Sequence, residues 1–98
     1  DEQSISKVVD KFLFEMEQQL NLKDVDLSVT QEVREWFARE GYDPQMGARP
    51  MERLIQERIR KPLAEELLFG KLVSGGSVRV SRAADELQFE IRGRGEEG

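Results

Sequence analysis

Apolar residues in this 98-residue chain repeat with two different periods, and this change of period constrains the fold more than any other feature. From Ile5 to Leu20 they recur every three or four residues, which predicts an amphipathic helix over about 4–21. Over 77–81 and 86–92 apolar and polar residues alternate instead, which predicts two half-buried strands. Only a short turn separates these strands, so we expect an antiparallel hairpin.

A third strand and a second helix are predicted between these regions. The strand covers 25–29, where apolar and polar residues again alternate. The helix begins near Thr30 or Gln31 and ends at Gly41, which can take the positive φ of a helix cap. The side chains predicted to face the core from this helix are Val33, Trp36 and Phe37.

Two more helices are predicted, one on each side of Pro62. The first runs over about 50–60. Pro62 lacks the N–H that a continuing helix needs, so we expect it to begin a new helix that is capped by Gly70. The side chains predicted to be buried by the two helices are Met51, Leu54, Ile55 and Ile59, followed by Leu63, Leu67 and Leu68.

Amphipathic helices and strands in one short chain must bury their apolar sides against each other. We therefore expect an α+β fold with about four helices packed on one side of a small three-stranded sheet. We expect residues 1–92 to form this single domain and 93–98, which contain no apolar side chain, to be a disordered tail. The first residue is Asp1 rather than Met, so we expect a fragment or a processed product.

The composition excludes several classes of function. The chain has no cysteine and no histidine, which removes Cys/His and Ser/His/Asp catalysis and the commonest metal ligands, so no metal site is expected. Its net charge of −5 argues against nucleic-acid binding, and no apolar run is long enough to cross a membrane. A phosphate-binding Walker A loop is missing too, because Gly70-Lys71 is followed by Leu72.

The segment 41–50 holds the main candidate site. Arg49 precedes Pro50, a residue suited to the first turn of a helix, so Arg49 is expected at a helix N-terminus. Free N–H groups and the helix dipole favour an anion there, and a guanidinium can bind phosphate through two hydrogen bonds. The spacing alone favours the plainer alternative, a surface arginine beside a turn.

Gly47-Ala48-Arg49-Pro50, continued by 51–56, resembles the sensor-2 motif of the Clp/Hsp100 branch of AAA+ ATPases. The resemblance extends through 61–70, 75–80 and 8–12, and it covers about 5–92. It is to the C-terminal small domain of the second AAA+ module, the D2-small domain. Several positions are more similar to the ClpA subfamily than to ClpB or ClpC: Met46, Met51, Lys61, Pro62 and the ending Leu67-Leu68-Phe69-Gly70.

The resemblance implies a role in an ATP site that is shared with a large AAA+ domain. Arg49 would contact the γ-phosphate of ATP as the sensor-2 residue in the assembled parent, and Gly47 and Ala48 would lie near the nucleoside. Mg²⁺ would be held elsewhere in the parent, and this chain alone would neither hydrolyse ATP nor bind it tightly.

The resemblance also implies partners. These are the large AAA+ domains of the same and neighbouring subunits in a hexamer, protein substrates, and a ClpP-type peptidase reached through the parent, a protein unfoldase of the bacterial cytoplasm. Two alternatives stay open. One is a fragment of a ClpB- or ClpC-like chaperone. The other is a standalone interaction module without nucleotide function, which would use an exposed sheet edge or helix face.

Overall fold

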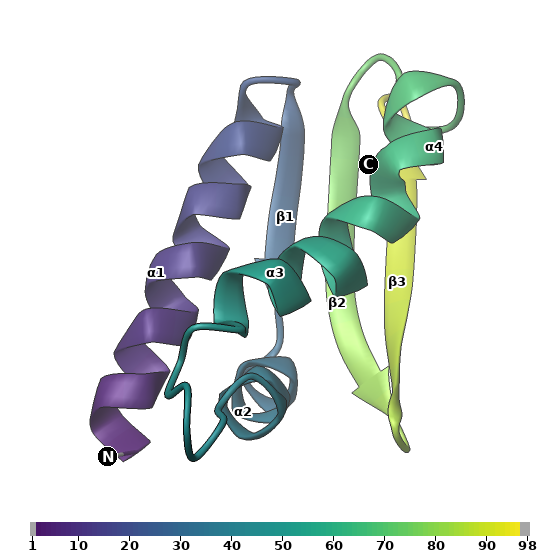
Figure 1. Cartoon of the computed structure of the whole chain (residues 1–98). Helices are drawn as coiled ribbons and strands as arrows, with labels where there is room; N and C mark the ends of the chain where they lie inside the picture. Colours follow the sequence, from purple (N-terminus) through teal and green to yellow (C-terminus); the bar gives the residue numbers. More distant parts are fainter. Residues whose placement is uncertain (1, 97–98) are drawn as a thin grey trace.

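The computed structural model describes residues 2–96, except for the side chain of Glu2, and it confirms the α+β fold (Figure 1). The first two helices and all three strands lie within about two residues of their predicted positions. In chain order the elements are α1 (Glu2–Asn21), β1 (Val25–Val29), α2 (Gln31–Glu40), α3 (Met51–Ile55), η1 (Gln56–Arg60), α4 (Lys61–Leu68), β2 (Gly76–Ala83) and β3 (Glu86–Gly93).

The strands form one sheet in the order β1-β2-β3. β1 and β2 are parallel, with Val25 beside Gly76, and the long crossover that parallel neighbours need is supplied by the helices between them. β2 and β3 form the predicted antiparallel hairpin. Its two-residue turn begins at Ala84, whose φ of +56° lies in the left-handed region.

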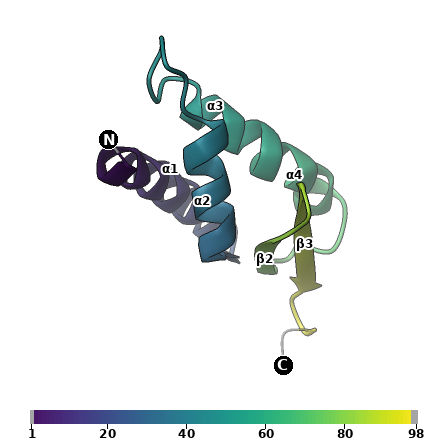
Figure 2. The same ribbon diagram turned by 90° about the horizontal axis from the view of Figure 1, so that it is seen from below.

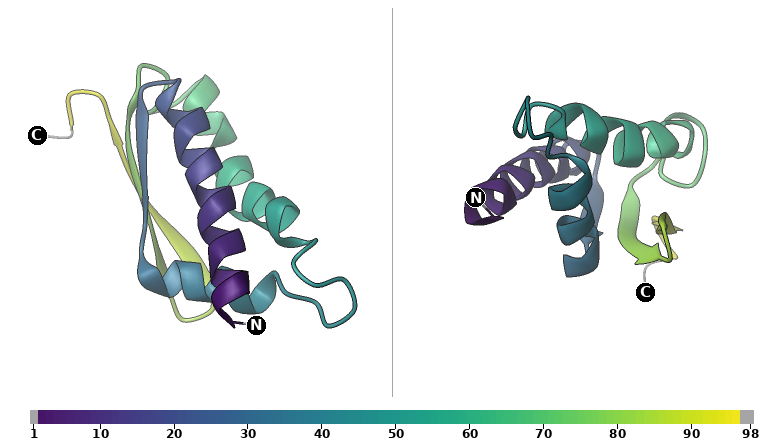
Figure 3. Two further views of the ribbon diagram at one scale, coloured as in Figure 1. Left: turned by 90° about the vertical axis from the view of Figure 1, so that its left-hand side faces the viewer. Right: turned by 60° about the horizontal axis from the view of Figure 1, so that its bottom comes forward.

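All the helices cover the same face of the sheet, and the apolar core lies between the two layers (Figure 3). Trp36 and Phe37 belong to this core as predicted, and their rings pack edge to face with centroids 5.1 Å apart. Each large side chain buried in this way contributes about 1.5–3 kcal/mol. The opposite face of the sheet is polar and exposed at Asp26, Ser28, Arg79, Glu90 and Arg92.

The third and fourth predicted helices form one continuous helix, so the expected break before Pro62 is absent. The middle of this helix, η1, has π-helical geometry, in which the Lys61 N–H donates to the Gln56 carbonyl five residues earlier. Pro62 still lies in the first turn of α4, as predicted.

The spacing of buried residues explains the π-helical turns. The fully buried side chains Met51, Ile55, Ile59 and Leu63 follow one another at intervals of four. In an α-helix of 3.6 residues per turn, such a series drifts steadily around the helix axis. Turns closed by i→i+5 hydrogen bonds contain more residues, so η1 returns all four side chains to the core side.

Two local predictions were wrong. Gly41 closes α2 through its N–H to the Phe37 carbonyl, at 2.8 Å, but its φ is −88° rather than positive. Leu68 is 59% exposed, because it follows the half-buried Leu67 and points about 100° further around the helix. Gly70 does donate to the Glu66 carbonyl after the end of α4.

The domain boundary after residue 92 and the disordered tail stay predictions. Gly93 is the last residue of β3, and its N–H donates to the Glu96 carboxylate at 2.7 Å. The tail's last residues, 97–98, lie outside the described part of the chain.

Candidate functional site

The candidate site lies in the loop between α2 and α3, which projects from the helical layer on the side away from the sheet (Figure 2). The start of α1 lies at the same end of the molecule in Figure 1 and in the left view of Figure 3. The loop therefore lies near the start of α1. Gly47, Ala48 and Arg49 are consecutive in its second half.

A tight turn holds the first half of the loop. Asp43 and Gly47 exchange two backbone hydrogen bonds, of 2.8 Å and 2.6 Å. Gly47 takes φ of +67°, a conformation that glycine adopts without the Cβ penalty. The turn therefore requires a glycine at the position that the sequence analysis assigned to nucleotide contact.

The Asp43 carboxylate completes this turn. Its Oδ1 accepts hydrogen bonds from the backbone N–H groups of Gln45 at 2.7 Å and Met46 at 2.9 Å. The hydrogen bond from Met46, and then that from Gln45, holds the pKa of Asp43 below its ordinary value of 3.8, because both stabilise the ionised form. The turn is thus strengthened by a negative charge that the sequence analysis did not single out.

Arg49 lies two residues before the first residue of α3 and is exposed. Its backbone belongs to the turn before α3, in which its N–H lies 3.4 Å from the Met46 carbonyl and the Met51 N–H donates to the Ala48 carbonyl at 3.0 Å. Its side chain makes no hydrogen bond or ion pair with the described part of the chain. The guanidinium is therefore available to an external anion, while Gly47 and Ala48 are both half-buried.

The described residues offer little else of chemical interest around this loop. Within residues 2–96, no group of three or more acidic side chains is placed to hold a metal ion. In the same residues, no helix combines the length and the apolar character that crossing a membrane requires. Arg49 is thus an exposed cation on a loop that the Asp43–Gly47 turn holds in place.

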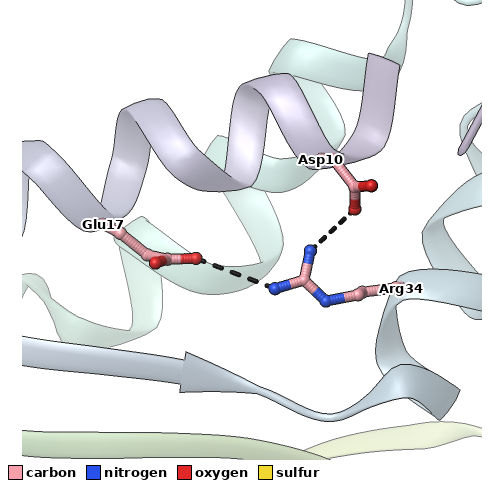
Figure 4. A network of polar contacts seen from close by, with 3 residues as sticks. All are labelled: Asp10, Glu17 and Arg34. Carbon is pink, nitrogen blue, oxygen red and sulfur yellow. Dashed lines mark hydrogen bonds and ion pairs between the residues drawn. The ribbon is translucent and has the colours of Figure 1, made fainter. Parts of the chain in front are cut away.

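A polar network on α1 and α2 was missed by the sequence analysis (Figure 4). The Arg34 guanidinium donates to Asp10 at 2.8 Å and lies 3.8 Å from the Glu17 carboxylate. These residues are far apart in sequence, so no local spacing could have indicated their contact. The network joins α1 to α2, whose C-terminal end begins the loop.

This chain is similar in sequence to a known protein family. The family described as "C-terminal, D2-small domain, of ClpB protein" matches residues 1–80. Among curated proteins, a "ClpA homolog protein" from Fuscovulum blasticum is 49% identical over 88 residues, which are 90% of this chain and 11% of that protein.

Two ClpB relatives are also similar. The "Chaperone protein ClpB" of Brucella suis biovar 1 is 34% identical over 87 residues, which are 89% of this chain and 10% of that protein. The protein of the same name from Mesorhizobium japonicum is 40% identical over 70 residues, 71% of this chain and 8% of that protein. The chain thus spans about a tenth of the length of the curated relatives that it matches.

Proposed function

Because this chain belongs to the family of D2-small domains of Clp/ClpB-type AAA+ chaperones, we propose that it is the lid domain of an ATP-dependent protein unfoldase. In this proposal the lid supplies Arg49 to the γ-phosphate of an ATP molecule bound by a preceding large domain. Gly47 and Ala48 allow close approach of the nucleoside. The magnesium ligands and the phosphate loop belong to the large domain.

The observation that supports this proposal is the position of Arg49. Its guanidinium is exposed and has no partner in the described part of the chain. The loop that carries Arg49 lies at the end of the molecule where α1 begins, so a domain that precedes α1 would adjoin the loop (Figure 3). A nucleotide between the two domains would then have this cation within reach.

The physical mechanism follows from that placement. A cation that contacts the last phosphate loses its partner when this phosphate is hydrolysed and released. The angle between the lid and the large domain then changes, as in hinge closure around a ligand. In a hexamer, where each lid also contacts a neighbouring subunit, such changes would move the substrate polypeptide.

We favour a ClpA-like parent that unfolds proteins in the bacterial cytoplasm and delivers them to a ClpP-type peptidase. The 49% identity to a ClpA homolog, against 34% and 40% for two ClpB proteins, supports this choice. A ClpB- or ClpC-like chaperone is the alternative. Adding a ClpP-type peptidase to the full-length protein with a folded substrate separates the ClpA-like parent from a ClpB-like one, since only the ClpA-like parent is proposed to bind the peptidase and deliver the substrate for degradation.

The test of the Arg49 role compares Arg49→Ala with Arg53→Ala in the full-length protein. Arg53 is a matched control, because it is also an exposed arginine of this region but pairs with Glu57 at 3.1 Å. We expect Arg49→Ala to lower the ATPase rate by roughly 10³-fold, as for other arginines that stabilise phosphoryl transfer, and Arg53→Ala to leave it unchanged. Equal ATPase rates in wild type and Arg49→Ala would refute the role.

The same substitution in the isolated chain separates function from folding. We expect Arg49→Ala to change its stability by at most about 0.5 kcal/mol, as for surface changes in general. A collapse of the melting temperature would instead assign Arg49 to the structure.

A further inference from the structure

β3 forms an outer edge of the sheet, and half of its backbone groups point away from β2. A two-residue turn joins Ala83 to Glu86, and the residues that flank such a turn form a hydrogen-bonded pair. Hydrogen-bonded pairs alternate along an antiparallel ladder. Leu87, Phe89 and Ile91 therefore direct their N–H and C=O groups outward, away from β2.

The other end of the hairpin agrees with this assignment. The Gly76 N–H donates to the Asp24 carbonyl on the β1 side, and the Gly93 N–H donates to the Glu96 carboxylate. The backbone N–H groups of Gly76 and Gly93 thus point away from each other, as they do in a non-hydrogen-bonded pair. Glu96 caps the outward N–H at residue 93, but the described part of the chain provides no such cap at 87, 89 or 91.

The side chains of β3 divide cleanly between its two faces. Leu87, Phe89 and Ile91 are half-buried on the helix-covered face, where a further strand would extend their apolar surroundings. The exposed face carries, in order, Glu86, Gln88, Glu90 and Arg92. The charge thus changes sign from one end of the strand to the other.

We propose that β3 pairs with β3 of a second copy of this chain, antiparallel, about a two-fold axis at Phe89. Leu87 then exchanges two hydrogen bonds with Ile91 of the second copy, Phe89 does so with its own equivalent, and the sheet becomes continuous across both chains. On the exposed face, Arg92 lies opposite Glu86 of the second copy, and this pair occurs twice. Opposite charges directly across an antiparallel pair are favourable.

The charges select this register over its neighbours. An axis at Gln88 would place Glu86 opposite Glu90 of the second copy, and an axis at Glu90 would place that carboxylate opposite its own equivalent. Like charges directly opposite each other are destabilising. β1, the other edge, is a poorer candidate, because it has five residues and its open face carries Asp26 and Ser28 without a basic side chain.

Charge reversal tests the proposal by sedimentation equilibrium of the purified chain. Glu86→Arg should weaken the dimer by about tenfold, because it replaces two attractive pairs with two repulsive ones. Arg92→Glu should weaken it at least as much, because it also replaces the Arg92–Glu90 ion pair within each strand, at 3.3 Å, with a repulsion. The double variant, with both reversals, should restore it. Asp26→Arg is the matched control, since Asp26 is exposed on the same face of the sheet but lies on β1, the strand that does not contact β3, and it should leave dimerisation unchanged. A wild-type chain that stays monomeric up to about 1 mM, or a dimer that ignores both reversals, would overturn the proposal.

Cross-linking tests the register itself. Because the chain has no natural cysteine, only the introduced cysteines can form a disulfide. A mixture of Gln88→Cys and Glu90→Cys chains should form a disulfide on mild oxidation, because these positions face each other as a close, non-hydrogen-bonded pair. Each variant alone meets its own equivalent diagonally at about 7–8 Å, too far for a bridge. Efficient cross-linking of either variant alone, with none in the mixture, would show a different register and refute the proposed one.

Discussion

Gly41 lies directly against the side chain of Met51. A Cβ atom at Gly41 would stand 2.5 Å from the Met51 sulfur and 2.9 Å from the Phe37 carbonyl oxygen. Met51 is fully buried, and Phe37 belongs to α2. The end of α2 and the start of α3 therefore touch through a contact that leaves no room for a side chain. This contact fixes both ends of the loop that carries Arg49.

We expect Gly41→Ala to destabilise the chain by about 1–3 kcal/mol, the usual cost of overpacking. The thioether can move, but the Phe37 carbonyl is part of the backbone and cannot move away freely. Chemical denaturation of the isolated chain measures the effect. Gly47→Ala is the control that separates overpacking from backbone conformation. Nothing lies within 4 Å of a Cβ at Gly47, so the stability lost should be only the left-handed φ penalty of about 1 kcal/mol. A Gly41→Ala chain as stable as wild type would contradict the close packing.

The turn at Asp43 should weaken in acid. Because the hydrogen bonds from Met46 and Gln45 depress the folded-state pKa, the carboxylate stabilises the turn above its unfolded pKa. This contribution is lost as the pH falls from about 4 through the folded pKa. Carboxyl NMR titration should give an Asp43 pKa below 3.8, and the amide signals of Gln45 and Met46 should shift with the same midpoint. A midpoint above 3.8 would contradict the hydrogen bonds.

The Arg34 network should contribute modestly to stability, and the contribution should depend on salt. Arg34 is 28% exposed and Asp10 is 59% exposed, so water screens their ion pair in part. We expect Asp10→Asn to cost about 0.5–1 kcal/mol at low ionic strength, and less in 1 M salt. Asp85→Asn, which removes the exposed partner of Arg82, should change the free energy of unfolding by less than about 0.5 kcal/mol. Equal effects of the two substitutions would show that the α1–α2 network adds nothing.

The sequence predicted the elements whose signals are local and repeated. The helix around Leu13, the alternating strands and the hairpin all depend on periodicity over many residues, and each was found where it was expected. Trp36 and Phe37 were placed in the core for the same reason. Gly47, Ala48 and Arg49 were found together on the loop because they are consecutive in the sequence.

What the sequence did not predict depends on contacts between distant residues. Gly41 was assigned a positive φ, whereas its actual constraint is the buried Met51 side chain across the loop. The contact of Arg34 with Asp10 forms only once α1 and α2 have packed. The continuous helix was missed because the rule for proline was applied to Pro62 without considering the regular four-residue spacing of the core positions.

The four-residue spacing of the core positions also determines how well the helix accommodates Pro62. A proline inside a regular α-helix costs about 3 kcal/mol, because a hydrogen bond is lost and the ring clashes with the carbonyl four residues earlier. Here η1 directly precedes α4, and the Lys61 N–H already bonds the carbonyl five residues earlier. The π-helical turn therefore shifts the carbonyls that would clash with the proline ring in an α-helix. The turn itself results from the spacing of the core positions. We expect Pro62→Ala to change the free energy of unfolding by less than about 1 kcal/mol, whereas Ile59→Ala, which empties a buried core position in η1, should cost about 2–5 kcal/mol. A gain near 3 kcal/mol for Pro62→Ala in chemical denaturation would mean that the proline strains the helix and that η1 is its consequence, not a result of the spacing of Met51, Ile55, Ile59 and Leu63.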